Sequence, residues 1–228
     1  MSNMKYLARI GIAATALSLS MSAYVNAESQ TSNLVDIKDL VTHSIGGNSS
    51  SGGAGGQRSS GLSSYMQIYG ETSAPLGFMN FCSRFPSDCM GGTVQPAVVE
   101  LDAGSWVALN HVNDVVNETV EAISDQDLYQ QPELWNYPTT QGDCEDYVLE
   151  KQKRLIALGW PKESLLITVA IDEYGGGHAV LTVKTSIGDL ILDNLLPDIL
   201  PWQQTVYTYV KRQSTSHPAL WVSLSSVD

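Results

Sequence analysis

The segment Gly142-Asp143-Cys144-Glu145-Asp146-Tyr147 organises the interpretation of the whole chain, because it places a cysteine among acidic residues where a helix is expected to begin. Helical spacing then continues through Val148, Lys151, Leu155 and Leu158. Gly159 follows, a residue favoured just past a helix end. Cys144 therefore falls in the first turn, where free backbone N–H groups and the helix dipole favour a thiolate. This position suits a nucleophile, and the alternative is a small buried hydrophobic residue.

Helices are expected before this segment and strands after it. Residues 105–123 form the clearest amphipathic helix, with apolar side chains at three- and four-residue steps. Downstream, residues 165–171, 178–185, 190–194 and 204–211 are rich in β-forming residues and are separated by glycine-containing turns. Helices followed by short, locally connected strands predict an α+β fold with helices packed on an antiparallel sheet.

A nucleophilic cysteine needs a base and a group that orients the base. Among four histidines, His178 opens a strand directly after three glycines, although a histidine there is also a common hairpin residue. Asp193 ends the apolar run of residues 190–192, and an unpaired buried carboxylate is costly, so it should have a partner.

The register of the hairpin decides whether these two residues meet. A type I turn with Gly188 as a bulge would bring Asp193 directly or diagonally across from His178. A tight turn centred on residues 187–188 would leave the two side chains further apart. The sequence leaves both registers open.

Residues 142–147, 177–181 and 192–195 together resemble the bacterial transglutaminase-like cysteine proteinase family, in order and in spacing. The likeness runs from about residue 75 to the tail and includes residues 202–207. It implies a papain-like/transglutaminase-like core. It also implies Cys144 as the nucleophile, His178 as the general base and then acid, and Asp193 as the residue that orients the imidazole.

The best-known branch of this family is periplasmic and calcium-dependent, and it clips large surface adhesins and so releases cells from biofilms. The resemblance implies that Asp143 and Glu145 hold calcium, with Asp146 as a weaker candidate. Electrostatics also favours a cation at this place. Carboxylates around a thiol oppose thiolate formation, and a bound cation would neutralise the charge of those carboxylates. The alternative is that Asp143 and Asp146 cap the helix.

The N-terminal part predicts export. Residues 1–27 combine Lys5 and Arg9, an apolar run and a small-residue cleavage pattern ending at Ala27, as in a signal peptide, with an uncleaved anchor as the alternative. Residues 28–61 read as a flexible Gly/Ser-rich linker, and residues 62–228 as one transglutaminase-like cysteine peptidase domain. We therefore expect a periplasmic protein with no membrane segment in its mature form.

Composition indicates which classes of partner to exclude and how the cysteines are paired. Without Lys5 and Arg9 the chain keeps 10 basic and 24 acidic residues, a net charge of −14 that argues against nucleic acid and anionic lipid. In an exported protein, Cys82 and Cys89 are read as a disulfide, with a metal-binding pair as the alternative. That disulfide would leave Cys144 as the free thiol.

The sequence thus predicts an exported cysteine peptidase that cleaves a protein substrate, with a surface adhesin and an inner-membrane regulator as further implications of the resemblance. Two alternatives remain open at this stage. A transglutaminase or amidase would form the same acyl-thioester, and a non-catalytic calcium-sensitive binding module would keep only the fold.

Overall fold

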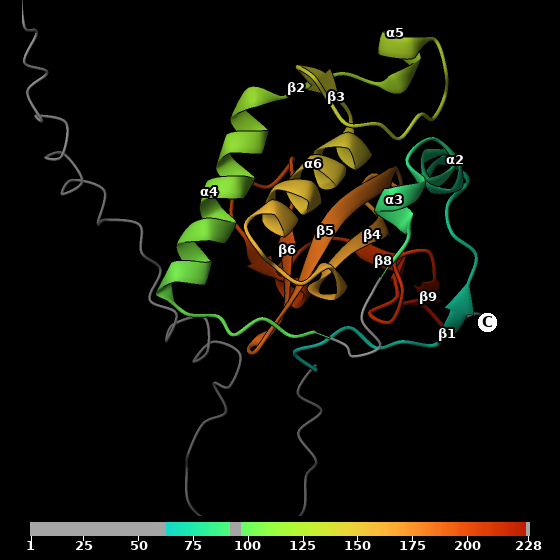
Figure 1. Ribbon diagram of the computed structural model, residues 1–228. Coiled ribbons are helices and arrows are strands. Elements are labelled where there is room, and N and C mark those ends of the chain that lie inside the picture. The colour runs from blue at the N-terminus through green and yellow to red at the C-terminus, as the bar shows by residue number, and fades with distance from the viewer. Residues whose placement is uncertain (1–62, 92–96, 227–228) are drawn as a thin grey trace, which may run out of the picture. The chain divides into compact units, whose positions relative to one another are not determined.

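The computed structural model describes residues 63–91 and 97–226, and their centre is an antiparallel sheet (Figure 1). In this described part the sheet has seven strands, in the order β1-β9-β8-β4-β5-β6-β7. Their bounds are β1 (Gly70–Thr72), β9 (Trp221–Ser223), β8 (Thr208–Gln213), β4 (Leu165–Ile171), β5 (Gly177–Thr185), β6 (Gly188–Leu192) and β7 (Leu200–Pro201). Each neighbouring pair is antiparallel. The predicted α+β fold is confirmed.

The described residues contain five α-helices. They are α2 (Leu76–Arg84), α3 (Pro86–Cys89), α4 (Ala103–Thr119), α5 (Asp125–Tyr129) and α6 (Cys144–Ala157). Helix α6 packs against β5 and β4, and α4 packs against α6 (Figure 1). In the described ranges, no helix is both long and apolar enough to cross a bilayer. The predicted signal peptide and the whole of the predicted linker lie outside the described residues.

Two predicted boundaries miss by four residues, and several others by one or two. The helix expected over residues 105–123 ends at Thr119, because Val120 takes an extended conformation and β2 (Glu121–Ala122) pairs in parallel with β3 (Gln141–Gly142). The strand expected to begin at residue 204 begins at Thr208, because residues Trp202–Gln204 form a 3-10 turn.

Each face of the sheet carries its own set of buried side chains. Leu155 of α6 and Ile167 and Leu181 of the sheet are fully buried. The opposite face carries a core of Met66, Ala170, Val180, Ile191 and Tyr209, with Trp202, Tyr207 and Leu224 packed around it. Because side chains alternate along a strand, His178 and Asp193 share the face of Val180 and Ile191.

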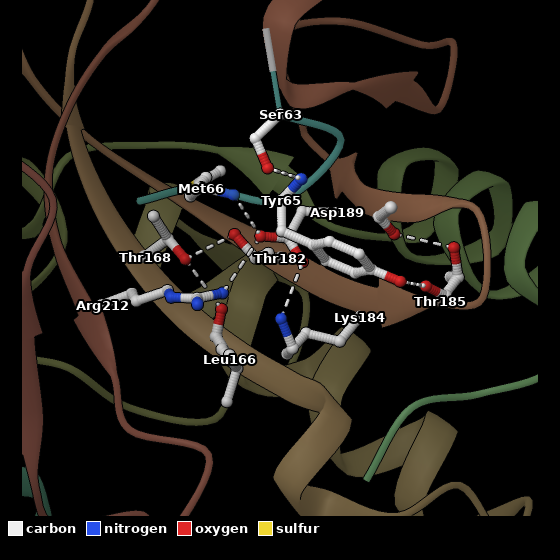
Figure 2. A network of polar contacts seen from close by, with 11 residues as sticks. Ser63, Tyr65, Met66, Leu166, Thr168, Thr182, Lys184, Thr185, Asp189 and Arg212 are labelled. Atoms are coloured by element: carbon white, nitrogen blue, oxygen red, sulfur yellow. Dashed lines mark hydrogen bonds and ion pairs between the residues drawn. The ribbon is translucent and has the colours of Figure 1, made fainter. Parts of the chain in front are cut away.

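A buried polar network fastens the first described residues to this second face (Figure 2). The Asp189 carboxylate accepts the Met66 N–H at 2.9 Å and lies 3.3 Å from both Lys184 Nζ and Arg212 Nη1. The Asp189 N–H donates in turn to the Ser64 carbonyl. Since Asp189 and Arg212 are almost wholly buried, their charges compensate each other where water does not reach.

The disulfide prediction is confirmed: Cys82 at the end of α2 is bonded to Cys89 in α3. Cys144 is the free cysteine of the described chain.

Candidate active site

Helix α6 places Cys144 at its first residue, as the sequence predicts. Cys144 and His178 line one cavity of about 180 Å³, together with Trp135, Glu145 and others. Cys144 is partly exposed and its sulfur lies near the Ala179 backbone N–H, which favours the thiolate. The structure therefore brings the predicted nucleophile and the predicted base to the same cavity.

The hairpin register brings the predicted base to its carboxylate. Thr185 pairs with Gly188, so the turn is centred on residues 186–187, one position earlier than the predicted tight turn and without a bulge in the pairing. Continued beyond Leu192, this register sets Asp193 opposite Val180 and diagonal to His178. Asp193 Oδ1 lies 2.8 Å from His178 Nε2, in a pair that is almost fully buried.

Asp193 is surrounded by donors. Its Oδ1 also accepts the Leu195 N–H at 3.1 Å, and its Oδ2 accepts the Tyr207 hydroxyl. Burial alone would raise the pKa of Asp193, but the hydrogen bonds from His178 and Tyr207 outweigh burial and lower it. Asp193 is therefore held as a carboxylate.

The backbone of Asp193 is held from the helical side of the sheet. Its carbonyl accepts the Lys151 ammonium at 2.8 Å and the Asn117 side-chain amide at 2.9 Å. Burial lowers the pKa of Lys151 to about 7. The turn that carries Asp193 is thus tied to both α6 and α4.

Burial and acidic neighbours together oppose the thiolate form of Cys144. The thiol donates to Glu145 Oε2 at 3.1 Å. Burial raises the pKa of Cys144 well above its usual range, and the charge of Glu145 raises it further. This is the opposition between carboxylates and thiolate that the sequence predicts.

Three carboxylates gather beside the nucleophile. Asp125, Asp143 and Glu145 each offer one ligand oxygen, and these oxygens all lie within 4.8 Å of one another. Burial and the nearby Asp143 raise the pKa of Glu145 to about 9. Oδ1 of Asp125 and Oδ1 of Asp143 are buried without a hydrogen-bond partner. Such a donor set fits a hard divalent cation, which takes carboxylate oxygens.

The remaining predictions about the acidic segment concern helix capping by Asp143 and calcium binding by Asp146. Asp143 occupies the N-cap of α6, but its side chain makes no capping bond, and its Oδ2 accepts the Asp125 N–H at 3.2 Å. The capping alternative is therefore wrong for Asp143. Asp146, the weaker predicted ligand, lies outside the group of three carboxylates, and its Oδ1 accepts the Asn136 N–H at 2.7 Å. Burial raises the pKa of Asp146 to about 8.

Sequence reasoning did not single out Asp125, Asn117, Lys151 or Tyr207 as contributors to this site. The sequence could have pointed to Lys151, since it is a charged residue within the buried stripe of the α6 helix. Asp125 gave no such signal, and Tyr207 lay in the segment 202–207 that the family likeness includes but had no role assigned, because each reaches the site from a segment whose approach depends on the tertiary fold.

The antiparallel sheet and a helix that begins at the free cysteine form a core of the transglutaminase-like class. Residues 68–228 match the family model described as bacterial transglutaminase-like cysteine proteinase BTLCP. The chain therefore belongs to that family and is a transglutaminase-like cysteine peptidase, whose substrate is a protein.

Two solved structures of LapG from Legionella pneumophila are similar to this chain. The calcium-bound form is 26% identical, with 54% of this chain and 72% of that one covered, at a TM-score of 0.46. A second LapG structure is 28% identical, with 52% and 67% covered, at a TM-score of 0.45. No curated protein matches the chain.

Proposed function

We propose that this peptidase works through a triad of Cys144, His178 and Asp193. The observation that carries the proposal is the buried His178–Asp193 pair at 2.8 Å, which opens on the cavity that the free Cys144 lines. An ionised Asp193 accepts a hydrogen from His178 Nε2, which leaves Nδ1 with a lone pair for the thiol proton.

The reaction then follows from these positions. His178 takes the thiol proton and Cys144 sulfur attacks the peptide carbonyl, with backbone N–H groups at the start of α6 facing the oxyanion. The C–N bond breaks, His178 returns the proton to the leaving amine, and a thioester remains on Cys144. Water, deprotonated by His178, hydrolyses the thioester and frees the thiol.

Cys144→Ala tests the triad. It should abolish cleavage while the melting temperature stays nearly unchanged, and His178→Ala should have almost the same effect, because such residues act as a unit. The readout is mass spectrometry of exposed cell-surface proteins after incubation with wild type or variant. New free N-termini support proteolysis, whereas isopeptides or Gln-to-Glu changes support a transglutaminase or amidase. Full cleavage by Cys144→Ala contradicts the triad.

We further propose that Asp125, Asp143 and Glu145 hold a calcium ion. Two orphaned carboxylate oxygens and a third carboxylate hydrogen-bonded to the nucleophile support this assignment. When bound, the ion supplies positive charge that neutralises the acidic field opposing the Cys144 thiolate.

The calcium assignment is tested without a substrate. Calcium should raise the melting temperature of the wild type above its value in EGTA, because an ion that binds the folded state stabilises it by mass action. Asp125→Asn and Asp143→Asn should lose this rise. Asp127→Asn is the matched control, because Asp127 lies on the same short helix α5 but is exposed and outside the carboxylate group. Equal melting temperatures in EGTA and millimolar calcium would contradict the assignment.

We also propose that the enzyme acts in the periplasm on a large surface adhesin, under an inner-membrane regulator. The signal-like residues 1–27 and the family resemblance support this setting. Deletion of the gene should leave a surface protein at its uncleaved length, and addition of the wild type but not Cys144→Ala should restore cleavage.

A further inference from the structure

Tyr207 stands out among the residues that the proposed reaction does not use. It lies between the Trp202–Gln204 turn and β8, and its hydroxyl donates to Asp193 Oδ2. Its ring centroid lies 5.2 Å from that of His178, at an interplanar angle of 52°. Tyr207 therefore touches both the proposed orienting carboxylate and the proposed base.

The Tyr207 contact completes the hydrogen bonding of Asp193. Oδ1 is shared by His178 and the Leu195 N–H, so Oδ2 without Tyr207 would keep no partner that the structure records. Asp193 is 1% exposed, so bulk water has little access to that oxygen. A buried carboxylate oxygen without a donor is costly, and the carboxylate can lower that cost by rotating or by binding a proton.

Both responses would weaken the hydrogen bond by which Asp193 orients His178. Rotation about the Cβ–Cγ bond moves Oδ1 away from Nε2. A protonated Asp193 no longer requires Nε2 to be the donor, so the imidazole could take the tautomer whose Nδ1 carries the hydrogen and cannot accept one from a thiol.

The aromatic surroundings hold the hydroxyl in place. The Tyr207 ring meets the Tyr209 ring edge-on, with centroids 6.4 Å apart at 90°. The Tyr209 hydroxyl is paired elsewhere, with Thr205 Oγ1 at 2.8 Å. Two neighbouring tyrosines thus share one packing environment, and Tyr207 is the one that contacts Asp193.

We propose that Tyr207 is a positioning residue that fixes the Asp193 carboxylate and, through it, the orientation and tautomer of His178. This inference rests on the proposed Cys144-His178-Asp193 triad and adds a fourth member that does not touch the substrate.

Tyr207→Phe removes the hydroxyl and keeps the ring against His178. Tyr209→Phe is the matched control, because it removes a hydroxyl from the adjacent ring and leaves the donors to Asp193 intact. p-Nitrophenyl acetate is the probe, since it transfers its acetyl group to a reactive thiol, releases p-nitrophenolate and needs no peptide recognition. The acylation rate constant and the half-saturating ester concentration are measured separately by stopped flow.

We expect Tyr207→Phe to slow acylation roughly ten- to a hundredfold, the effect of losing one hydrogen bond to a charged group, with the half-saturating concentration unchanged. Tyr209→Phe should acylate within about twofold of the wild type, since no hydrogen bond to the triad is removed. In a Cys144→Ala background, the ¹⁵N NMR spectrum of the His178 ring should show a larger fraction of the tautomer with the hydrogen on Nδ1 in Tyr207→Phe, because a rotated or protonated Asp193 no longer requires Nε2 to be the donor.

The possible outcomes distinguish a failure of this inference from a failure of the proposed triad. Acylation of Tyr207→Phe at the wild-type rate overturns the inference, and so does slow acylation with an unchanged ¹⁵N spectrum of the His178 ring, which marks a purely structural role. A comparable loss in Tyr209→Phe also overturns it. A burst from Cys144→Ala would instead overturn the triad, whatever Tyr207→Phe does.

Discussion

At the residue scale, the site stabilises the charge of one member of the proposed triad and opposes the charge of another. Burial and Glu145 raise the pKa of Cys144, whereas donors keep Asp193 ionised. The two effects act on neighbouring members of one proposed triad, and they imply that His178 is well oriented while the thiol still needs its acidic surroundings neutralised. A cation held by Glu145 and its neighbours would meet that need.

Lys151 permits a pH test at this scale. Burial holds its pKa at about 7 in the folded protein, below the value of about 10.4 for an unfolded chain. Between these two values the unfolded chain binds the extra proton, so stability rises with pH. Relative to Lys151→Met, the wild type should gain up to about 1.4 kcal/mol of unfolding free energy per pH unit above pH 7.

Urea denaturation at pH 7, 8 and 9 with the disulfide intact measures this gain. Lys153→Met is the matched control, because Lys153 lies on the same helix but is exposed, and its stability should follow the wild type across the series. A constant difference between wild type and Lys151→Met would show that Lys151 stays charged.

At the element scale, periodicity predicted the parts that fold locally and missed those that depend on distant partners. The start of α6 at Cys144 and the strand over residues 165–171 follow from residue spacing alone. The edge strands β1 and β7 did not, because two or three residues carry no period and their pairing is set by β9 and β6. The turn register also escaped prediction, since the approach of Ser64 to Gly188 comes from tertiary packing.

Gly188 should therefore be indispensable to the hairpin that carries His178 and Asp193. Its φ is +134°, and a Cβ there would lie 2.5 Å from the Ser64 carbonyl oxygen. Gly188→Ala should lower the unfolding free energy by about 1–3 kcal/mol, combining backbone strain with that clash. Denaturation curves measure the loss.

Gly175→Ala separates the two causes. Gly175 also has a positive φ, +86°, but a Cβ there would meet nothing within 4 Å. It should cost less than Gly188→Ala, and an equal cost would mean that the approach of Ser64 does not matter.

At the scale of the whole molecule, one free thiol, one disulfide and a strongly acidic chain fit a protein that works outside the reducing cytoplasm. The Cys82–Cys89 bond closes a short loop between α2 and α3, and in the chain-entropy model such a loop stabilises by roughly 2–3 kcal/mol. The proposed export would therefore allow this disulfide to form and to stabilise the fold, besides giving the enzyme access to its proposed substrate.

Processing of the N-terminus tests export directly. The protein recovered from the periplasm should begin at Glu28, because Val25 and Ala27 supply the small residues that signal cleavage requires. Ala27→Phe should leave a longer, unprocessed chain, whereas Asn26→Phe, the matched control at the position between them, should be processed normally. N-terminal sequencing and intact mass distinguish these products. Recovery of the wild type in the periplasm with Met1 or Ser2 still at its N-terminus would contradict a cleaved signal and favour an uncleaved anchor.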